Sequence, residues 1–132
     1  MKYRLCRAAI AAALTALALT AFAQAQFPFE REIVLDVQPL PGSKRVPMLE
    51  IFADGRAQID LWCRSGEGRA EVEGETIKFT LGPMQEERCT PERSERDDQL
   101  AASLAEVTRW RLEDDVVVLT GSAELRFRLS TH

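Results

Sequence analysis

The sequence predicts a mainly β fold with one α-helix, in which a small antiparallel sheet closes like a barrel. Three observations predict it. Several short segments alternate apolar and polar residues, turns rich in glycine separate them, and one stretch changes to helical periodicity. Alternation with a period of two gives a strand one apolar and one charged face, as in sheets covered on one side and in barrels. The length of 132 residues predicts one domain.

The first 25 residues predict a cleaved secretory signal peptide. The basic residues Lys2, Arg4 and Arg7 precede an apolar run over 10–22, and Ala23-Gln24-Ala25 places small residues where a signal peptidase cuts. A membrane span needs roughly 20 apolar residues, so we expect no stable membrane anchor after cleavage. The expected organisation is a signal peptide over 1–25 and a β domain over 26–132, located in the periplasm or secreted.

The charge of the mature domain argues against nucleic acid as a partner. Of 17 Lys and Arg residues, three lie in the predicted signal peptide, which leaves 14 against 21 Asp and Glu and a formal charge of −7. Nucleic acid and anionic lipid both require a basic face on the protein.

The predicted strands follow one another along the chain. The first covers 31–37, and the next two, Met48–Ala53 and Arg56–Cys63, flank Asp54-Gly55, a strong hairpin signal. A second hairpin joins 69–73 to 76–81 around Gly74. After the helix we expect two or three strands, with a final pair over 116–119 and 124–129 and a turn at Asp114-Asp115.

The helix is predicted to begin at Thr90-Pro91-Glu92, which offers a cap, a proline in the first turn and an acidic residue beside it. Leu100, Leu104 and Val107 then recur with helical spacing over about four turns.

The mature domain retains Cys63 and Cys89, since Cys6 leaves with the signal peptide. Two cysteines in an oxidising compartment usually form a disulfide, which here would join a strand end to the helix entrance. The alternative is two separate buried thiols. We expect no metal site, because the two cysteines lack zinc-ligand spacing and the only histidine, His132, is the last residue.

The order of these motifs resembles the META-domain family, the HslJ-like proteins of bacterial envelopes, from about Val46 to Leu129. The resemblance is carried by Met48-Leu-Glu-Ile-Phe-Ala-Asp-Gly55, Leu61-Trp62-Cys63, Ile77-Lys-Phe79, Cys89 with Leu100–Val107, Leu119-Thr-Gly121 and Leu125-Arg-Phe127. Family members often have Gly-Cys-Asn where this chain has Trp62-Cys63-Arg64. The resemblance implies a barrel-like fold with one helix and an envelope role that is linked in some members to stress or antibiotic tolerance. It implies no catalytic residue and no cofactor.

The residues themselves predict no enzyme. No Gly-x-Ser-x-Gly elbow is present, and the acidic pairs Glu86-Glu87, Asp97-Asp98 and Asp114-Asp115 are interpreted as solvated charges, because neighbouring acids do not converge across a cleft. Strict alternation places Trp62 opposite the apolar face of its strand. A binding surface is therefore hypothesised at Trp62, Arg64 and Arg88, beside a loop at Gly66–Gly68. The alternative is that Trp62 is covered and the arginines pair with nearby acids. Trp110 is expected to plug the core or its rim.

We therefore expect an exported, non-catalytic envelope module whose partner is an envelope protein or a small ligand. The alternative is a secreted protein inhibitor of the lysozyme-inhibitor type, which shares the size, acidity and disulfide. The Ser-Gly-Ala-x-Tyr type of loop of those inhibitors is missing, and the only tyrosine, Tyr3, lies in the signal peptide.

Overall fold

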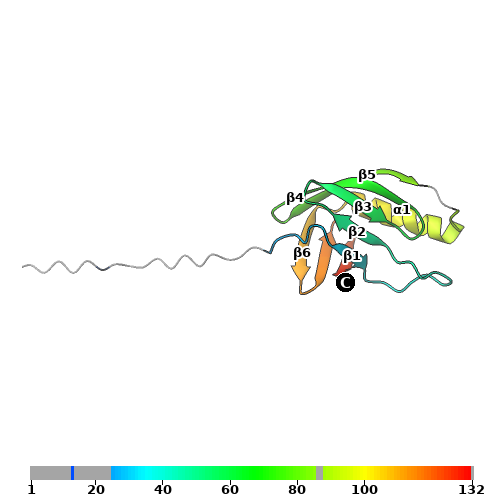
Figure 1. Cartoon of the computed structure of the whole chain (residues 1–132), viewed down its shortest axis with the longest axis horizontal. Coiled ribbons are helices and arrows are strands. Elements are labelled where there is room, and N and C mark those ends of the chain that lie inside the picture. The colour runs from blue at the N-terminus through cyan, green and yellow to red at the C-terminus, as the bar shows by residue number, and fades with distance from the viewer. Residues whose placement is uncertain (1–12, 14–24, 86–87, 132) are drawn as a thin grey trace, which may run out of the picture.

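Eight antiparallel strands and one helix make up the part of the chain that the structure describes, residue 13 and residues 25–85 and 88–131 (Figure 1). This structure is a computed structural model. The elements in chain order are β1 Glu32–Leu35, β2 Met48–Ile51, β3 Arg56–Asp60, β4 Ser65–Glu73, β5 Thr76–Gln85, α1 Pro91–Ala105, β6 Arg109–Glu113, β7 Val116–Thr120 and β8 Glu124–Leu129. Nearly all of the predicted signal peptide lies outside the described residues. Within them, no helix is long and apolar enough to cross a membrane.

Each strand pairs with the next one in the chain, and β8 pairs with β1, so the sheet closes into a ring. The predicted mainly β, barrel-like fold with one helix is confirmed. Closure removes most of the unpaired strand edges that an open sheet would expose. The thinnest join lies between β5 and β6, where Thr76 and Arg109 are the single pair of register partners.

The core forms because alternate residues of the strands point into the ring. In β1, β2, β3 and β5 the buried residues follow the predicted period of two. The largest fully buried apolar side chains are Phe127, Ile33, Leu49, Ile51, Ile59, Leu61, Ile77, Leu104, Leu119, Val117 and Val118.

The helix α1 begins as the sequence predicts. The Thr90 side chain accepts a hydrogen bond from the Arg93 backbone N–H at 3.3 Å, and Pro91 occupies the first turn. Leu100 and Leu104 face the core, whereas Val107 lies beyond the helix end and is nevertheless buried. Figure 1 shows α1 following β5 along the chain, and the two elements pack against each other.

Two boundary predictions are wrong. β3 ends at Asp60 rather than at Cys63, because the chain turns and the Leu61 N–H donates to the Arg64 carbonyl at 2.8 Å. The segment Gly66–Gly68 is not a loop, since it belongs to β4 and pairs with both β3 and β5 through an irregular register. A Cβ on Gly68 would lie 2.5 Å from the Thr80 carbonyl oxygen, so this close approach of strands requires glycine.

The N-terminal segment closes one end of the ring. Phe27 is buried, and its ring packs edge-on against Trp110 with centroids 5.1 Å apart. The Trp110 indole N–H donates to the Gly74 carbonyl at 2.8 Å. Trp110 is therefore a core residue, within the expectation for it, and it lies on β6, the first strand after the helix.

Candidate functional site

The hypothesised surface around Trp62 lacks the exposed ring on which it was based. Trp62 is 7% exposed and belongs to the hydrophobic core, so the alternative that the ring is covered is confirmed and simple alternation misplaces it. The physical reason is that Leu61, Trp62 and Cys63 lie in the turn after β3, where strand alternation no longer applies and all three side chains are buried. Ligand binding at this surface stays a prediction that the burial of Trp62 does not support.

Arg64 is held by the helix rather than free for a ligand. Its guanidinium donates to Asp98 Oδ1 at 2.6 Å, to the Ser94 carbonyl at 2.9 Å and to Asp97 Oδ2 at 3.3 Å. The hydrogen bond to Asp98 raises the pKa of Arg64 above its ordinary value, against the cost of burial. Arg88, the third hypothesised residue, is exposed.

Asp97 is the buried charge that the sequence did not reveal. It is 0% exposed, so its interpretation as a solvated charge is wrong. Its carboxylate accepts from the Cys63 backbone N–H at 3.2 Å and from the Arg64 backbone N–H at 2.8 Å. These bonds come from residues more than 30 positions away in the chain. Asp97 therefore fastens the helix to the turn after β3.

The disulfide lies at the same place. Cys63 and Cys89 are bonded with their Cα atoms 5.9 Å apart, as the cysteine count predicted. The bridge joins the turn after β3 to the residue before the helix cap, next to the Asp97 contacts. Together the bridge and Asp97 position α1 on the sheet, which makes this cluster structural.

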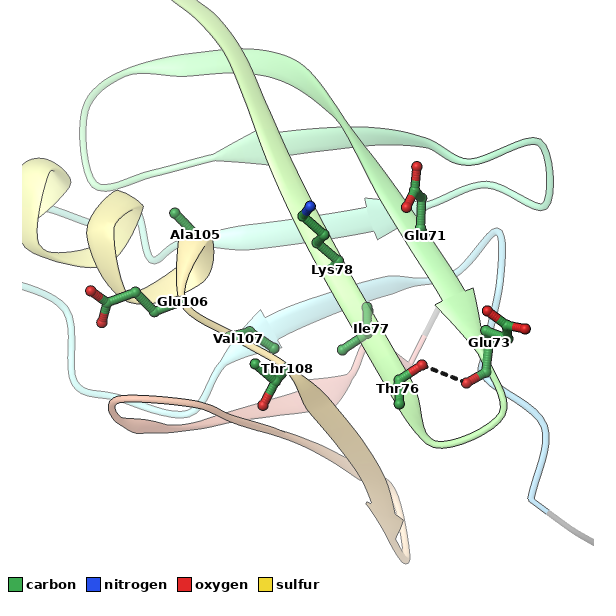
Figure 2. Close-up of a pocket in the computed structure, with 9 residues that line it drawn as sticks. All are labelled: Glu71, Glu73, Thr76, Ile77, Lys78, Ala105, Glu106, Val107 and Thr108. Atoms are coloured by element: carbon green, nitrogen blue, oxygen red, sulfur yellow. Dashed lines mark hydrogen bonds between the residues drawn. The ribbon is translucent and has the colours of Figure 1, made fainter.

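The candidate binding site is a groove of about 440 Å³ between β5 and the end of the helix (Figure 2). Its charged lining comes from two sides. Glu71 and Glu73 lie on β4, Lys78 stands on β5, and Glu106 lies across the groove at the helix end. Three carboxylates against one ammonium group give this lining a net negative charge.

The floor and ends of the groove come from the seam between β5 and β6. Ile77 and Val107 are buried at the floor, while Thr76 and Thr108 lie at its lower end (Figure 2). The Thr76 hydroxyl donates to the Glu73 carbonyl at 2.7 Å, which holds the β4–β5 turn.

The groove lies where the pairing of β5 with β6 ends and the chain from the helix end faces β5 instead. On this side of β5 the Trp110 N–H donates to the Glu75 carbonyl at 3.0 Å and the Ile77 N–H donates to the Thr108 carbonyl at 3.1 Å. Beyond this point the chain that faces β5 runs back from Thr108 to the helix end at Ala105, and this segment precedes β6 and forms the other wall of the groove. The sequence analysis did not predict the groove. Its two walls come from the segments 71–78 and 105–108, which are far apart in the chain.

The side chains that line the groove can bind a ligand through charge, hydrogen bonds and apolar contact. Its side chains are carboxylates, an amine, two hydroxyls and apolar groups. Among the residues that the structure describes, no three His, Cys, Asp or Glu side chains gather in a way that could hold a metal ion.

One comparison with a solved structure agrees with the fold. A solved structure described as "NMR structure of the protein" superposes with a TM-score of 0.60 at 16% sequence identity, covering 76% of this chain and 89% of that chain. A crystal structure of a DUF4847 family protein from Bacteroides vulgatus ATCC 8482 gives a TM-score of 0.49 at 13% identity, over 62% of this chain and 57% of that one. No curated protein matches the chain. The META domain family model matches residues 17–131, and the chain therefore belongs to the META-domain family.

Proposed function

We propose that this chain is an exported, non-catalytic module of the bacterial envelope that binds a partner in the groove between β5 and the helix end. The observation that carries the proposal is the disulfide between Cys63 and Cys89. Disulfides of this structural kind persist in oxidising compartments and are rare in the cytosol. The signal-peptide pattern over 1–25 supports the same location.

The N-terminal residue of the protein in the cell tests whether it is exported, because export predicts cleavage between Ala25 and Gln26. We expect mass spectrometry of the protein from the periplasmic fraction to find Gln26 as its N-terminal residue. In a matched variant, Ala25→Arg, the residue before the cut is no longer small, and the precursor should accumulate. An intact N-terminus on protein confined to the cytosol would overturn the proposal.

A role under envelope stress is the finer part of the proposal, and family membership supports it. A deletion strain should survive envelope-damaging treatment less well than its parent. The full chain should restore survival, whereas a chain that lacks residues 2–25 should not, because it stays in the cytosol. Equal rescue by both chains would separate the role from the envelope.

The second candidate is a secreted inhibitor of a basic hydrolase such as lysozyme. The acidic lining of the groove favours it, because opposite charge speeds association. Lysozyme assays with increasing amounts of the purified protein decide this point. Unchanged lysozyme activity at a large excess of protein would dismiss the inhibitor.

A further inference from the structure

Cleavage between Ala25 and Gln26 gives the mature chain glutamine as its first residue. We infer that this N-terminal Gln26 cyclises to pyroglutamate, a five-membered lactam that has no free amine. The inference rests on the proposed export, because export creates the new terminus. It assigns a covalent modification to the mature chain and a consequence of it for the N-terminal segment that closes the ring of strands.

The reaction takes place within one residue. The α-amine nitrogen of Gln26 attacks the side-chain amide carbon Cδ, so a new N–Cδ bond forms and the Cδ–Nε2 bond breaks. A proton passes from the amine to the departing nitrogen, and one molecule of ammonia leaves. No oxidant, reductant or co-reactant is needed. The nucleophile is the unprotonated amine, and an α-amine titrates close to neutral pH, unlike the amine of a lysine side chain.

The structure leaves Gln26 free to close this lactam in the folded protein. Gln26 is exposed, and among the described residues no hydrogen bond involves its side chain. The next residue, Phe27, is 6% exposed and packs against Trp110 with ring centroids 5.1 Å apart. The lactam forms by rotation about bonds of Gln26 alone, so the anchoring of Phe27 does not hinder it.

An ion pair at the new terminus would slow cyclisation, because a nearby carboxylate keeps an amine protonated. Ala25, the residue before the cut, lines a pocket of about 210 Å³ together with Glu75 and Trp110. The Glu75 carboxylate is already paired with the Arg109 guanidinium at 2.7 Å. The described residues of this lining therefore offer the new amine no unpaired carboxylate.

The lactam protects the segment that closes the ring of strands. Aminopeptidases bind a free α-ammonium group, which pyroglutamate lacks, so the bond between Gln26 and Phe27 is not cut from the terminus. The next bond is a tertiary amide, because Pro28 follows Phe27, and few aminopeptidases cut such a bond. The lactam and Pro28 therefore guard two successive bonds, and Phe27 keeps its contact with Trp110.

Mass spectrometry of the mature protein from the periplasmic fraction tests the inference. We expect the N-terminal peptide to be lighter by one ammonia than its sequence from Gln26, and the cyclised fraction to rise while the folded protein is kept at neutral pH. The matched control is Gln26→Glu, since a carboxylate is a much poorer acceptor for the amine, and this variant should keep its terminus free over the same time.

Edman sequencing locates the lost ammonia at the terminus. The wild-type chain should be blocked, and treatment of the unfolded chain with pyroglutamyl aminopeptidase should make Phe27 the first residue that is read. The Gln26→Glu variant should be sequenced directly. A cleaved wild-type chain that is read from Gln26 after the same incubation would overturn cyclisation and leave the proposed export standing. An intact Met1 terminus would overturn the export itself, and cyclisation with it.

Discussion

Two neighbouring aspartates show how the environment of a residue decides its role. Asp97 is fully buried and accepts hydrogen bonds from three N–H groups of Cys63 and Arg64. The Asp98 side chain is instead 70% exposed and forms an ion pair with Arg64. In the sequence the two are indistinguishable. The burial of Asp97 depends on backbone N–H groups that the disulfide and the turn after β3 bring to it, and no local pattern contains that information.

Replacing each aspartate should therefore give different results. Asp97→Ala leaves the N–H groups of Cys63 and Arg64 buried without an acceptor and should lower the free energy of unfolding by about 3–5 kcal/mol. Asp98→Ala removes an exposed ion pair and should cost no more than about 1 kcal/mol. Urea denaturation followed by circular dichroism measures both. Similar small losses would mean that Asp97 does not fasten the helix.

Trp62 carries the second prediction at this scale. Because its ring is buried in the core, Trp62→Ala should lower the free energy of unfolding by about 3–5 kcal/mol. The control is Val37→Ala, a truncation of a side chain that is 43% exposed, which should be nearly neutral. An unchanged melting temperature for Trp62→Ala would restore the exposed-ring hypothesis.

At the scale of elements, local signals were reliable and long-range ones were not. The helix start at Thr90-Pro91 and the turn at Asp114-Asp115 both appear as predicted, and Asp114 adopts the left-handed conformation, with φ of 53°. Aspartate tolerates that conformation better than most residues. Gly66–Gly68 was predicted as a loop because glycine usually marks one, but here glycine permits two strands to approach closely.

The outer face of β6, β7 and β8 carries a ladder of charges over a buried valine. Val118 is 0% exposed although its register partners, Arg111 and Arg126, are charged. Both arginines reach Glu113, at 2.9 Å and 3.1 Å, and their hydrocarbon stems can cover Val118. Strand alternation alone predicts that Val118 is exposed. The arginine stems that lie beside it explain why it is buried instead.

This ladder predicts a pH dependence. The hydrogen bond from Arg111, and next that from Arg126, lowers the pKa of Glu113 below its ordinary value of 4.5. A carboxyl whose pKa is lowered on folding adds stability above the unfolded-state value, and this stability is lost as pH falls through the folded-state value. The melting-temperature difference between wild type and Glu113→Gln should therefore be present at neutral pH and vanish in acid. Added salt should reduce it. A difference that persists in acid would assign it to packing instead.

At the scale of the whole molecule, the sheet closes only where distant segments meet. The sequence predicted the strands and their order in hairpins, but not the pairing of β1 with β8 or the separation of β5 from β6. Closure depends on register between chain ends, and the groove depends on a pairing that stops. Both are properties of the assembled ring, which is why the candidate site was not among the predicted residues.

The N-terminal segment gives the last prediction. Phe27 packs against Trp110 and Phe29, with ring centroids 5.1 Å and 5.0 Å away, and closes the ring two residues after the predicted cleavage site. Phe27→Ala should therefore lower the free energy of unfolding by about 3–5 kcal/mol, although it lies near a chain end where changes are usually tolerated. Hydrogen exchange should also accelerate in β6, because Trp110 loses its neighbour.

Gln26→Ala is the matched control for Phe27→Ala, since Gln26 is exposed and adjacent in the chain. It should leave both the unfolding free energy and the exchange in β6 unchanged. If Phe27→Ala behaves like Gln26→Ala, the segment does not seal the ring in solution, and closure must then rest on the pairing of β1 with β8 alone. If it destabilises as expected, a signal peptidase cut that removed Phe27 would yield a weakened domain, so the position of the cut and the stability of the fold are coupled through one aromatic ring.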